Sequence, residues 1–173
     1  MWQKALNNGI IGGLVSIALT LIGTLTGMMD PVGSGEFSTG SAIFSVLGIA
    51  ISIFFIRRAM IQFRDEDNGG ILSYGQGLGV GILTALVMGI LSALYLYVHL
   101  TMIDPEAISA MQEQVRQGME DGGMTEEEIE SAEGMTNLFS SAPFFAISSI
   151  FSSVFIGLII SLIVAALTKR DAA

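Results

Sequence analysis

Closely spaced glycines between Ser73 and Gly81, in "SYGQGLGVG", give the stretch of this sequence that most resembles a phosphate-binding loop. A dinucleotide-binding fingerprint needs G-x-G-x-x-G, and a P-loop ends in Gly-Lys followed by Ser or Thr. Here Val80 stands where the fingerprint needs its third glycine, and no lysine follows. Ser73 and Gln76 instead match the S-x-x-Q capping box that begins a helix. The stretch therefore predicts a helix start and no nucleotide site.

Two acidic stretches could bind cations. The run "DEDNGG" from Asp65 resembles the start of an EF-hand loop, but Gln76 stands at the twelfth position, where calcium needs a bidentate Glu. The acidic residues at 126–128 and 130 have the composition of a solvated helix face. No metal site is predicted at either stretch.

His99 is the only histidine, and the chain contains no cysteine, so a usual zinc site is not expected. Tyr95 and Tyr97 lie beside it, which is typical of an aromatic belt at a membrane interface. Membrane-embedded proteolysis needs a paired acid or a nucleophile with its base, and proton-coupled transport leaves an ionisable residue inside a span. No carboxylate lies within the predicted spans, and His99 stands at the outer end of the third, so we expect no enzyme activity and no cofactor.

These segments dominate the chain, which is 51% hydrophobic and only 13% charged over 173 residues. Four blocks lack Asp, Glu, Lys and Arg altogether: 7–29, 37–56, 68–103 and 138–168. A helix that crosses a bilayer needs roughly 20 apolar residues. The first block is longer than the apolar part of a secretory signal, so we expect it to be retained. We predict an all-α integral membrane protein, one membrane domain over 1–173, with four transmembrane helices near 9–29, 38–56, 74–99 and 142–167.

Basic residues predict how the chain is oriented. Six of the seven flank one side of the predicted spans: Lys4, Arg57, Arg58, Arg64, Lys169 and Arg170. Only Arg116 falls on the other side, and an excess of Lys and Arg marks the cytoplasm. Both termini are therefore expected in the cytoplasm. The outer side then has one basic and twelve acidic residues, a net charge of −11, and the inner side has six against four, a net charge of +2. No nucleic-acid partner is expected.

The segment 104–137 is the only sizeable polar part, and it carries ten of the outer acids. We expect Asp104 to cap a helix with Pro105 at its first position, "DGG" at 121–123 to end it, and Thr125 with Glu128 to form a capping box for a second helix. The prediction is an acidic extracytoplasmic helical hairpin. It is either an interaction surface for a basic partner or cations, or solvated surface alone. The other outer loop, 30–40, is expected to be a short turn.

Small residues recur at every fourth position in three predicted helices, which lets helix backbones approach closely in lipid. The candidate helix-packing residues are Gly12, Ser16 and Thr20 in the first helix, Gly77, Gly81, Ala85 and Gly89 in the third, and Ser153, Gly157 and Ser161 in the fourth. The glycine spacing of 8–18 also matches that of 76–86, so a duplicated two-helix unit remains open.

Three motifs carry a resemblance to a known family: "NGIIGG" near the N-terminus, "NGGILSYGQGLGVG" before the third span and "YLYVHLTMIDPE" after it. With four spans, the chain resembles the small bacterial membrane proteins grouped as domain of unknown function 4199. The resemblance covers nearly the whole chain and implies a protein of the bacterial inner membrane. It supplies no activity and no site residues.

The sequence favours a non-enzymatic accessory or scaffold subunit that packs against the lipid bilayer and against itself or another membrane protein. The alternative is a small channel or transporter for an uncharged solute. The two differ in where the small-residue rows point: toward other helices for a scaffold, or along a water-filled path for a channel.

Overall fold

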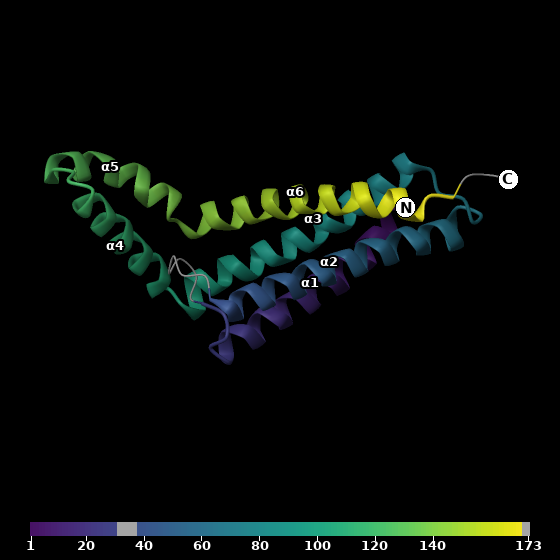
Figure 1. The fold of residues 1–173 in the computed structure, drawn as a ribbon, viewed down its shortest axis with the longest axis horizontal. Coiled ribbons are helices and arrows are strands. Elements are labelled where there is room, and N and C mark those ends of the chain that lie inside the picture. Colours follow the sequence, from purple (N-terminus) through teal and green to yellow (C-terminus); the bar gives the residue numbers. More distant parts are fainter. Residues whose placement is uncertain (31–37, 171–173) are drawn as a thin grey trace.

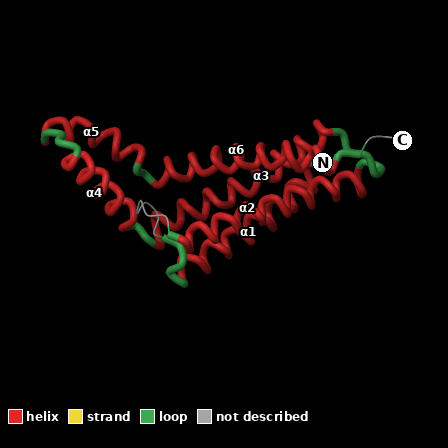
Figure 2. Tube along the Cα trace, in the orientation of Figure 1, coloured by secondary structure: helices red, strands yellow, loops and turns green. Residues whose placement is uncertain are grey.

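The computed structural model describes residues 1–30 and 38–170, and every regular element in them is helical (Figures 1 and 2). The elements are α1 (Trp2–Leu25), α2 (Thr39–Gln62), η1 (Phe63–Asp67), α3 (Tyr74–Val98), η2 (His99–Ile103), α4 (Glu106–Asp121), α5 (Glu126–Phe139) and α6 (Ala142–Thr168), where η marks a π-helical turn. Most of the predicted 30–40 turn, including Glu36, lies outside the described residues, as does Asp171.

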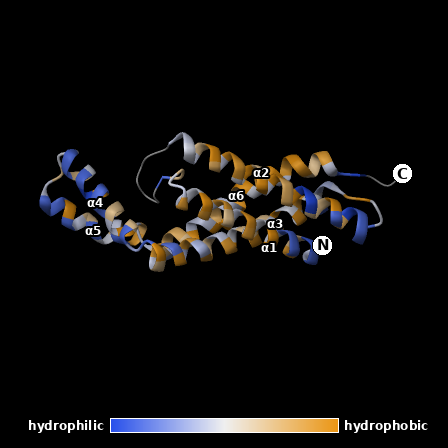
Figure 3. Ribbon diagram, turned by 90° about the horizontal axis from the view of Figure 1, so that it is seen from below, coloured by the Kyte–Doolittle hydropathy of each residue, from blue (hydrophilic) through white to orange (hydrophobic). Residues whose placement is uncertain are grey.

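Four helices are long and apolar enough to cross a membrane: Trp2–Leu25, Thr39–Asp67, Tyr74–Ile103 and Ala142–Thr168. They form a multi-pass bundle of the kind expected for a membrane protein. Figure 3 shows mostly hydrophobic residues along them, and hydrophilic residues at one end of the bundle and along α4 and α5. In α3, 50% of the most apolar window is buried, against 17–28% in the other three, so α3 is the central helix.

The helices begin and end at different residues from those predicted by charge-free blocks. The helix α1 begins at Trp2 and includes Lys4, because a polar residue at a helix end does not interrupt the backbone hydrogen bonding. It ends at Leu25, before a turn in which Gly27 takes a φ of +66° that favours glycine. The helix α2 continues through η1 until Gly69 and Gly70, both with positive φ, end it.

The predicted capping boxes at Ser73 with Gln76 and at Thr125 with Glu128 are both present. The prediction that Asp104 caps α4 is wrong. Pro105 occupies the cap position, and no side chain there bonds the helix. Asp104 instead closes the π-helical turn before it, because its N–H donates to the His99 carbonyl at 2.8 Å.

The N-terminus and Arg170, the last described residue, lie at the same end of the bundle, together with the connection between α2 and α3. Leu72 pairs with Arg170 through two antiparallel backbone hydrogen bonds of 2.9 Å. The N-terminal amine lies 3.6 Å from Asp67, and Lys4 contacts the same carboxylate at 3.8 Å. Three segments that are distant in the sequence are therefore joined at this end, which we call the terminal end.

The side chains that pack between the helices are most completely buried toward the terminal end. Ile56, Met60, Leu72 and Val80 are fully inaccessible and belong to one cluster from α2, α3, α6 and the α2–α3 connection. A buried polar contact lies beside them, because Asn8 donates to the Gln62 side chain at 2.7 Å. This end of the bundle is therefore filled by side chains.

Candidate functional site

Among the described helices, the most extensive contact is an antiparallel seam between α3 and α6. Along both helices the facing residues follow at steps of four: Gly77 with Ala165, Gly81 with Ser161, Ala85 with Gly157, and Gly89 with Ser153. A Cβ added at Gly81 would lie 2.6 Å from the Met60 methyl and 2.7 Å from the Ser161 Cβ. One added at Gly89 would lie 2.8 Å from the Ser153 Cβ. Side chains larger than these would separate the two helices.

The predicted rows in α3 and α6 thus face each other within one chain. Ser161 is fully buried in this seam, and among the described residues its hydroxyl has no hydrogen-bond partner. A lone buried hydroxyl costs roughly 1–3 kcal/mol. The small size of serine, and not its polarity, is therefore what the seam uses at this position.

The predicted small-residue row in α1 does not face a second row of small residues. Gly12 is buried against Phe55 and Met88, whereas Ser16 and Thr20 line cavities. The helix α1 packs against both α2 and α3, so a row of four-residue spacing faces the groove between them. Its close approach to α3 instead uses two other glycines. A Cβ at Gly9 would lie 2.6 Å from the Val87 Cβ, and one at Gly13 would lie 2.8 Å from the Leu91 Cδ1.

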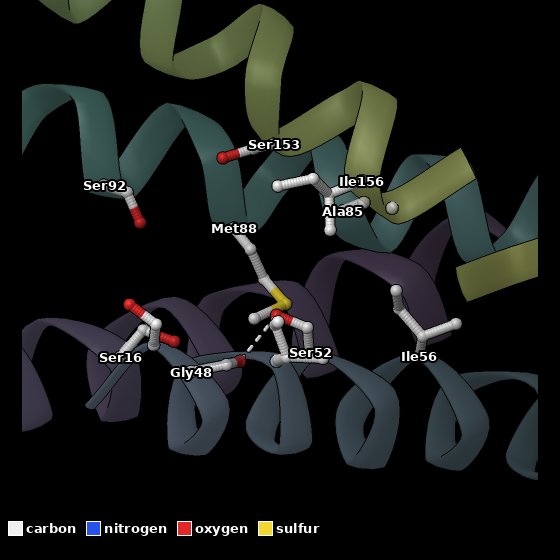
Figure 4. A pocket seen from close by; sticks show the side chains of 12 residues that line it. Ser16, Gly48, Ser52, Ile56, Ala85, Met88, Ser92, Ser153 and Ile156 are labelled. Carbon is white, nitrogen blue, oxygen red and sulfur yellow. Dashed lines mark hydrogen bonds between the residues drawn. The ribbon is translucent and has the colours of Figure 1, made fainter. Parts of the chain in front are cut away.

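A central cavity of about 330 Å³ lies where α1, α2, α3 and α6 separate (Figure 4). Five serines contribute to its wall: Ser16, Ser45, Ser52, Ser92 and Ser153. The rest of the lining is apolar or glycine, including Ile49, Ile56, Met88 and Ile156. Among the described residues, none that lines this cavity is charged. Its chemistry is therefore restricted to hydrogen bonding by hydroxyls within an apolar enclosure.

A second cavity of about 390 Å³ lies toward the opposite end, and we call it the outer cavity. It continues along the same two helices, because Thr20 and Thr24 of α1 and Tyr95 and His99 of α3 line it. His99 is 6% exposed, and its Nδ1 lies 3.4 Å from the Tyr95 hydroxyl. The aromatic-belt interpretation thus misplaces His99, which faces the cavity, whereas Tyr97 is exposed.

The helices α4 and α5 form a pair that extends beyond the bundle, at the end opposite the terminal end (Figure 1). Arg116 on α4 joins them, because its guanidinium contacts Glu126 at 2.6 Å and Glu133 at 3.3 Å on α5. It also contacts Glu120 on its own helix at 3.1 Å. The hydrogen bond to Glu120, with the charges of the other carboxylates, raises the pKa of Arg116. The single basic residue of the segment therefore holds the pair together.

The start of α5 is stabilised by its capping box. The Thr125 N–H donates to the Glu128 carboxylate at 2.8 Å and the Thr125 hydroxyl donates to it at 2.9 Å. These two donors lower the pKa of Glu128, the backbone N–H having the larger effect. All four glutamates of the run are exposed, and two of them have contacts within the pair: Glu126 with Arg116, and Glu128 with Thr125. The sequence predicted the capping role of Glu128, but the contact between Glu126 and Arg116 becomes visible only in the structure.

The α4–α5 pair also carries exposed apolar side chains. Met135 is 67% exposed and Phe139 is 49% exposed, and both line a groove with Val115 and Met119. Within residues 1–30 and 38–170, no three His, Asp or Glu side chains are placed to share a metal ion. The pair therefore offers apolar contact and negative charge on one projecting element.

A comparison with known protein families identifies the family of this chain. The model of the family described as "Protein of unknown function (DUF4199)" matches residues 7–170. The chain belongs to the DUF4199 family. No curated protein and no solved structure matches it. The match includes most of α1, the other three membrane-spanning helices and the α4–α5 pair.

For several residues of this DUF4199 chain, the contacts that they make become known only from the structure. Gly9 and Gly13 have the spacing of a small-residue pair, so a signal for them is present in the sequence. Arg116 is recognisable as one cation among ten acids, with Glu120 at helical spacing. Ser92 carries no such signal, because its exposure to the central cavity depends on where neighbouring helices separate.

Proposed function

We propose that this DUF4199 protein is a non-enzymatic accessory or scaffold subunit of the bacterial inner membrane, with the α4–α5 pair as its partner-binding part. The observation that carries the proposal is that the pair extends beyond the bundle while Arg116 braces it internally. A projecting, braced element with exposed Met135 and Phe139 suits contact with another protein.

Charge supports an outer location for this pair. Lys4, Arg64 and Arg170 lie at the terminal end, and the acidic segment lies at the other. Excess basic residues mark the cytoplasmic side, so the termini would be cytoplasmic and the acidic hairpin extracytoplasmic. A partner with a basic surface is then favoured, since attraction between charges acts within about 8 Å at physiological salt.

The small-residue rows also bear on the role. The α3–α6 seam is used within the chain, which makes a rigid support for the hairpin and leaves those rows unavailable to a second protein. A partner subunit would therefore contact the hairpin or the remaining lipid-facing surfaces. Self-association would likewise have to use surfaces other than the α3–α6 seam.

The test is partner capture from native membranes in mild detergent with tagged full-length protein. In the variant Glu127→Gln/Glu130→Gln, two exposed charges are removed while the Arg116 contacts and the capping box remain. We expect a lower yield of specific partners than for wild type at low salt, and equal yields at high salt. Glu106→Gln/Glu113→Gln is the matched control, because it removes two charges nearer the base of α4. Equal capture by all three proteins at low salt would contradict the role of the distal charges.

A second candidate function is a small channel or transporter for an uncharged solute. It is favoured by one observation: Ser16, Thr20 and Thr24 line successive cavities along α1. Against it stands the filled terminal end, where Ile56 and Met60 are fully buried below the central cavity. Conduction would need these side chains to move, whereas partner binding by the hairpin needs no such change.

A further inference from the structure

The central cavity contains hydroxyls that the protein itself does not use. Ser45 and Ser52 donate to carbonyls of their own helix, at 2.8 Å and 3.0 Å. Across residues 1–30 and 38–170, no protein atom accepts or donates a hydrogen bond at the hydroxyls of Ser16, Ser92 or Ser153. These three come from α1, α3 and α6, and Figure 4 shows their side chains bordering one space above α2.

The depth of the cavity in the membrane makes unpartnered hydroxyls costly. Ser16 lies nine residues before the end of α1 at Leu25, which at a rise of 1.5 Å per residue is about 14 Å along the helix. The hydrocarbon core is about 30 Å thick, so the cavity lies near its middle. A polar group without a partner in such surroundings costs several kcal/mol. A polar group that enters the cavity from outside the protein would give these three hydroxyls a partner at this depth.

The lining restricts the charge of that group. In the part of the chain that the structure describes, no Asp, Glu, Lys, Arg or His lines the central cavity. A charged group near the bilayer centre is disfavoured unless it is paired, and nothing here pairs with it. The group is therefore uncharged and forms hydrogen bonds, as a hydroxyl or an ester carbonyl does.

The rim of the cavity indicates where the occupant comes from. Ile49 on α2 and Ile156 on α6 border the cavity, and 47% and 46% of each is exposed. In a bilayer these exposed side chains face lipid tails, so the cavity is reached sideways from the hydrocarbon between α2 and α6. The buried side chains of Ile56 and Met88 supply an apolar wall for a hydrocarbon chain.

We propose that the central cavity binds an uncharged, lipid-like molecule whose hydroxyl or carbonyl is held by Ser16, Ser92 and Ser153. Its hydrocarbon part lies along the isoleucines and extends between α2 and α6 into the bilayer. The inference goes beyond the scaffold role, because it concerns a ligand site in the bundle and does not depend on the hairpin or its partner.

The test uses full-length protein in phosphatidylcholine vesicles with a long-chain alcohol that carries a diazirine near its hydroxyl. We expect photolabelling of residues on the cavity wall, reduced by unlabelled hexadecanol or diacylglycerol and not by hexadecane. In Ser16→Ala/Ser92→Ala/Ser153→Ala, hexadecanol should compete about tenfold less well, since each lost hydrogen bond contributes modestly. Ser45→Ala/Ser52→Ala, whose hydroxyls are bonded to their own helix, should behave as wild type.

Equal competition by hexadecane and hexadecanol would overturn the proposal, and so would wild-type behaviour of the triple variant. Competition by glycerol as strong as that by hexadecanol would assign the site to a free solute and overturn the lipid-like occupant. The thermal unfolding of each variant in detergent checks that the bundle is intact. If the triple variant does not fold, Ser92→Ala alone is compared with Ser52→Ala, and the same difference in competition is expected.

Discussion

Individual small side chains determine how close the helices approach in this protein. At Gly81 and Gly89 the opposing helix occupies the space of a Cβ, whereas at Gly79, in the same helix, the nearest atom outside its own backbone would be the Met1 sulfur at 3.8 Å. The sequence pattern predicts that such glycines pack, but it does not tell which glycine faces which helix. That depends on how α3 is rotated between its neighbours.

The single variants Gly81→Leu and Gly79→Leu test this difference, because both place the same side chain in the same helix. Gly81→Leu must displace Ser161 and Met60, and overpacking of this kind costs about 1–3 kcal/mol, with more expected where the helix backbones must separate. We expect a clearly lower unfolding temperature for Gly81→Leu in detergent and a small change for Gly79→Leu. Equal unfolding temperatures for the two variants would refute the seam.

The ionisation of Glu128 predicts how the stability of the first turn of α5 depends on pH. Its pKa is lowered by the Thr125 donors in the folded state, so the cap stabilises α5 fully above the ordinary glutamate range. That contribution is lost as pH falls through the lowered folded value. Hydrogen exchange in the first turn of α5, compared between wild type and Glu128→Ala at the same pH, should be slower in wild type at pH 7. The difference should disappear in strong acid. A difference that persists unchanged in acid would argue against the carboxylate cap.

Among the elements, the four membrane-spanning helices follow from composition, since apolar blocks of this length are stable as helices in a bilayer. The caps at Ser73 and Thr125 were also predictable, because their partners lie three residues away. The cap at Asp104 was not, because the π-helical turn η2 redirects its backbone. Local patterns thus predict helix starts unless a neighbouring turn uses the same residue.

The two cavities could not be predicted from the spacing of small residues in the sequence. The α1 row of small and hydroxyl residues is indistinguishable in spacing from the rows of α3 and α6. Only the latter two face each other, while Ser16 and Thr20 face spaces between helices. Whether a small residue fills a contact or lines a cavity depends on the position of a third helix.

For the whole molecule, the structure places the N-terminus, Arg170 and the α2–α3 connection at one end and the α4–α5 pair at the other. This arrangement agrees with an even number of spans and with the separation of charge along the chain. Which end faces the cytoplasm is a prediction from the basic residues. The proposed hairpin function depends on it, because an external partner requires an external hairpin.

The most direct test of the account is the side of the membrane on which the α4–α5 pair lies. The chain has no cysteine, so single cysteines at exposed Glu127 and Gln3 give unambiguous labelling. In intact cells with a permeable outer barrier, a membrane-impermeant maleimide should label Glu127→Cys. It should label Gln3→Cys only after the membrane that contains the protein is opened. The reverse pattern, with Gln3→Cys labelled in intact cells and Glu127→Cys protected, would place the acidic pair in the cytoplasm and contradict the account.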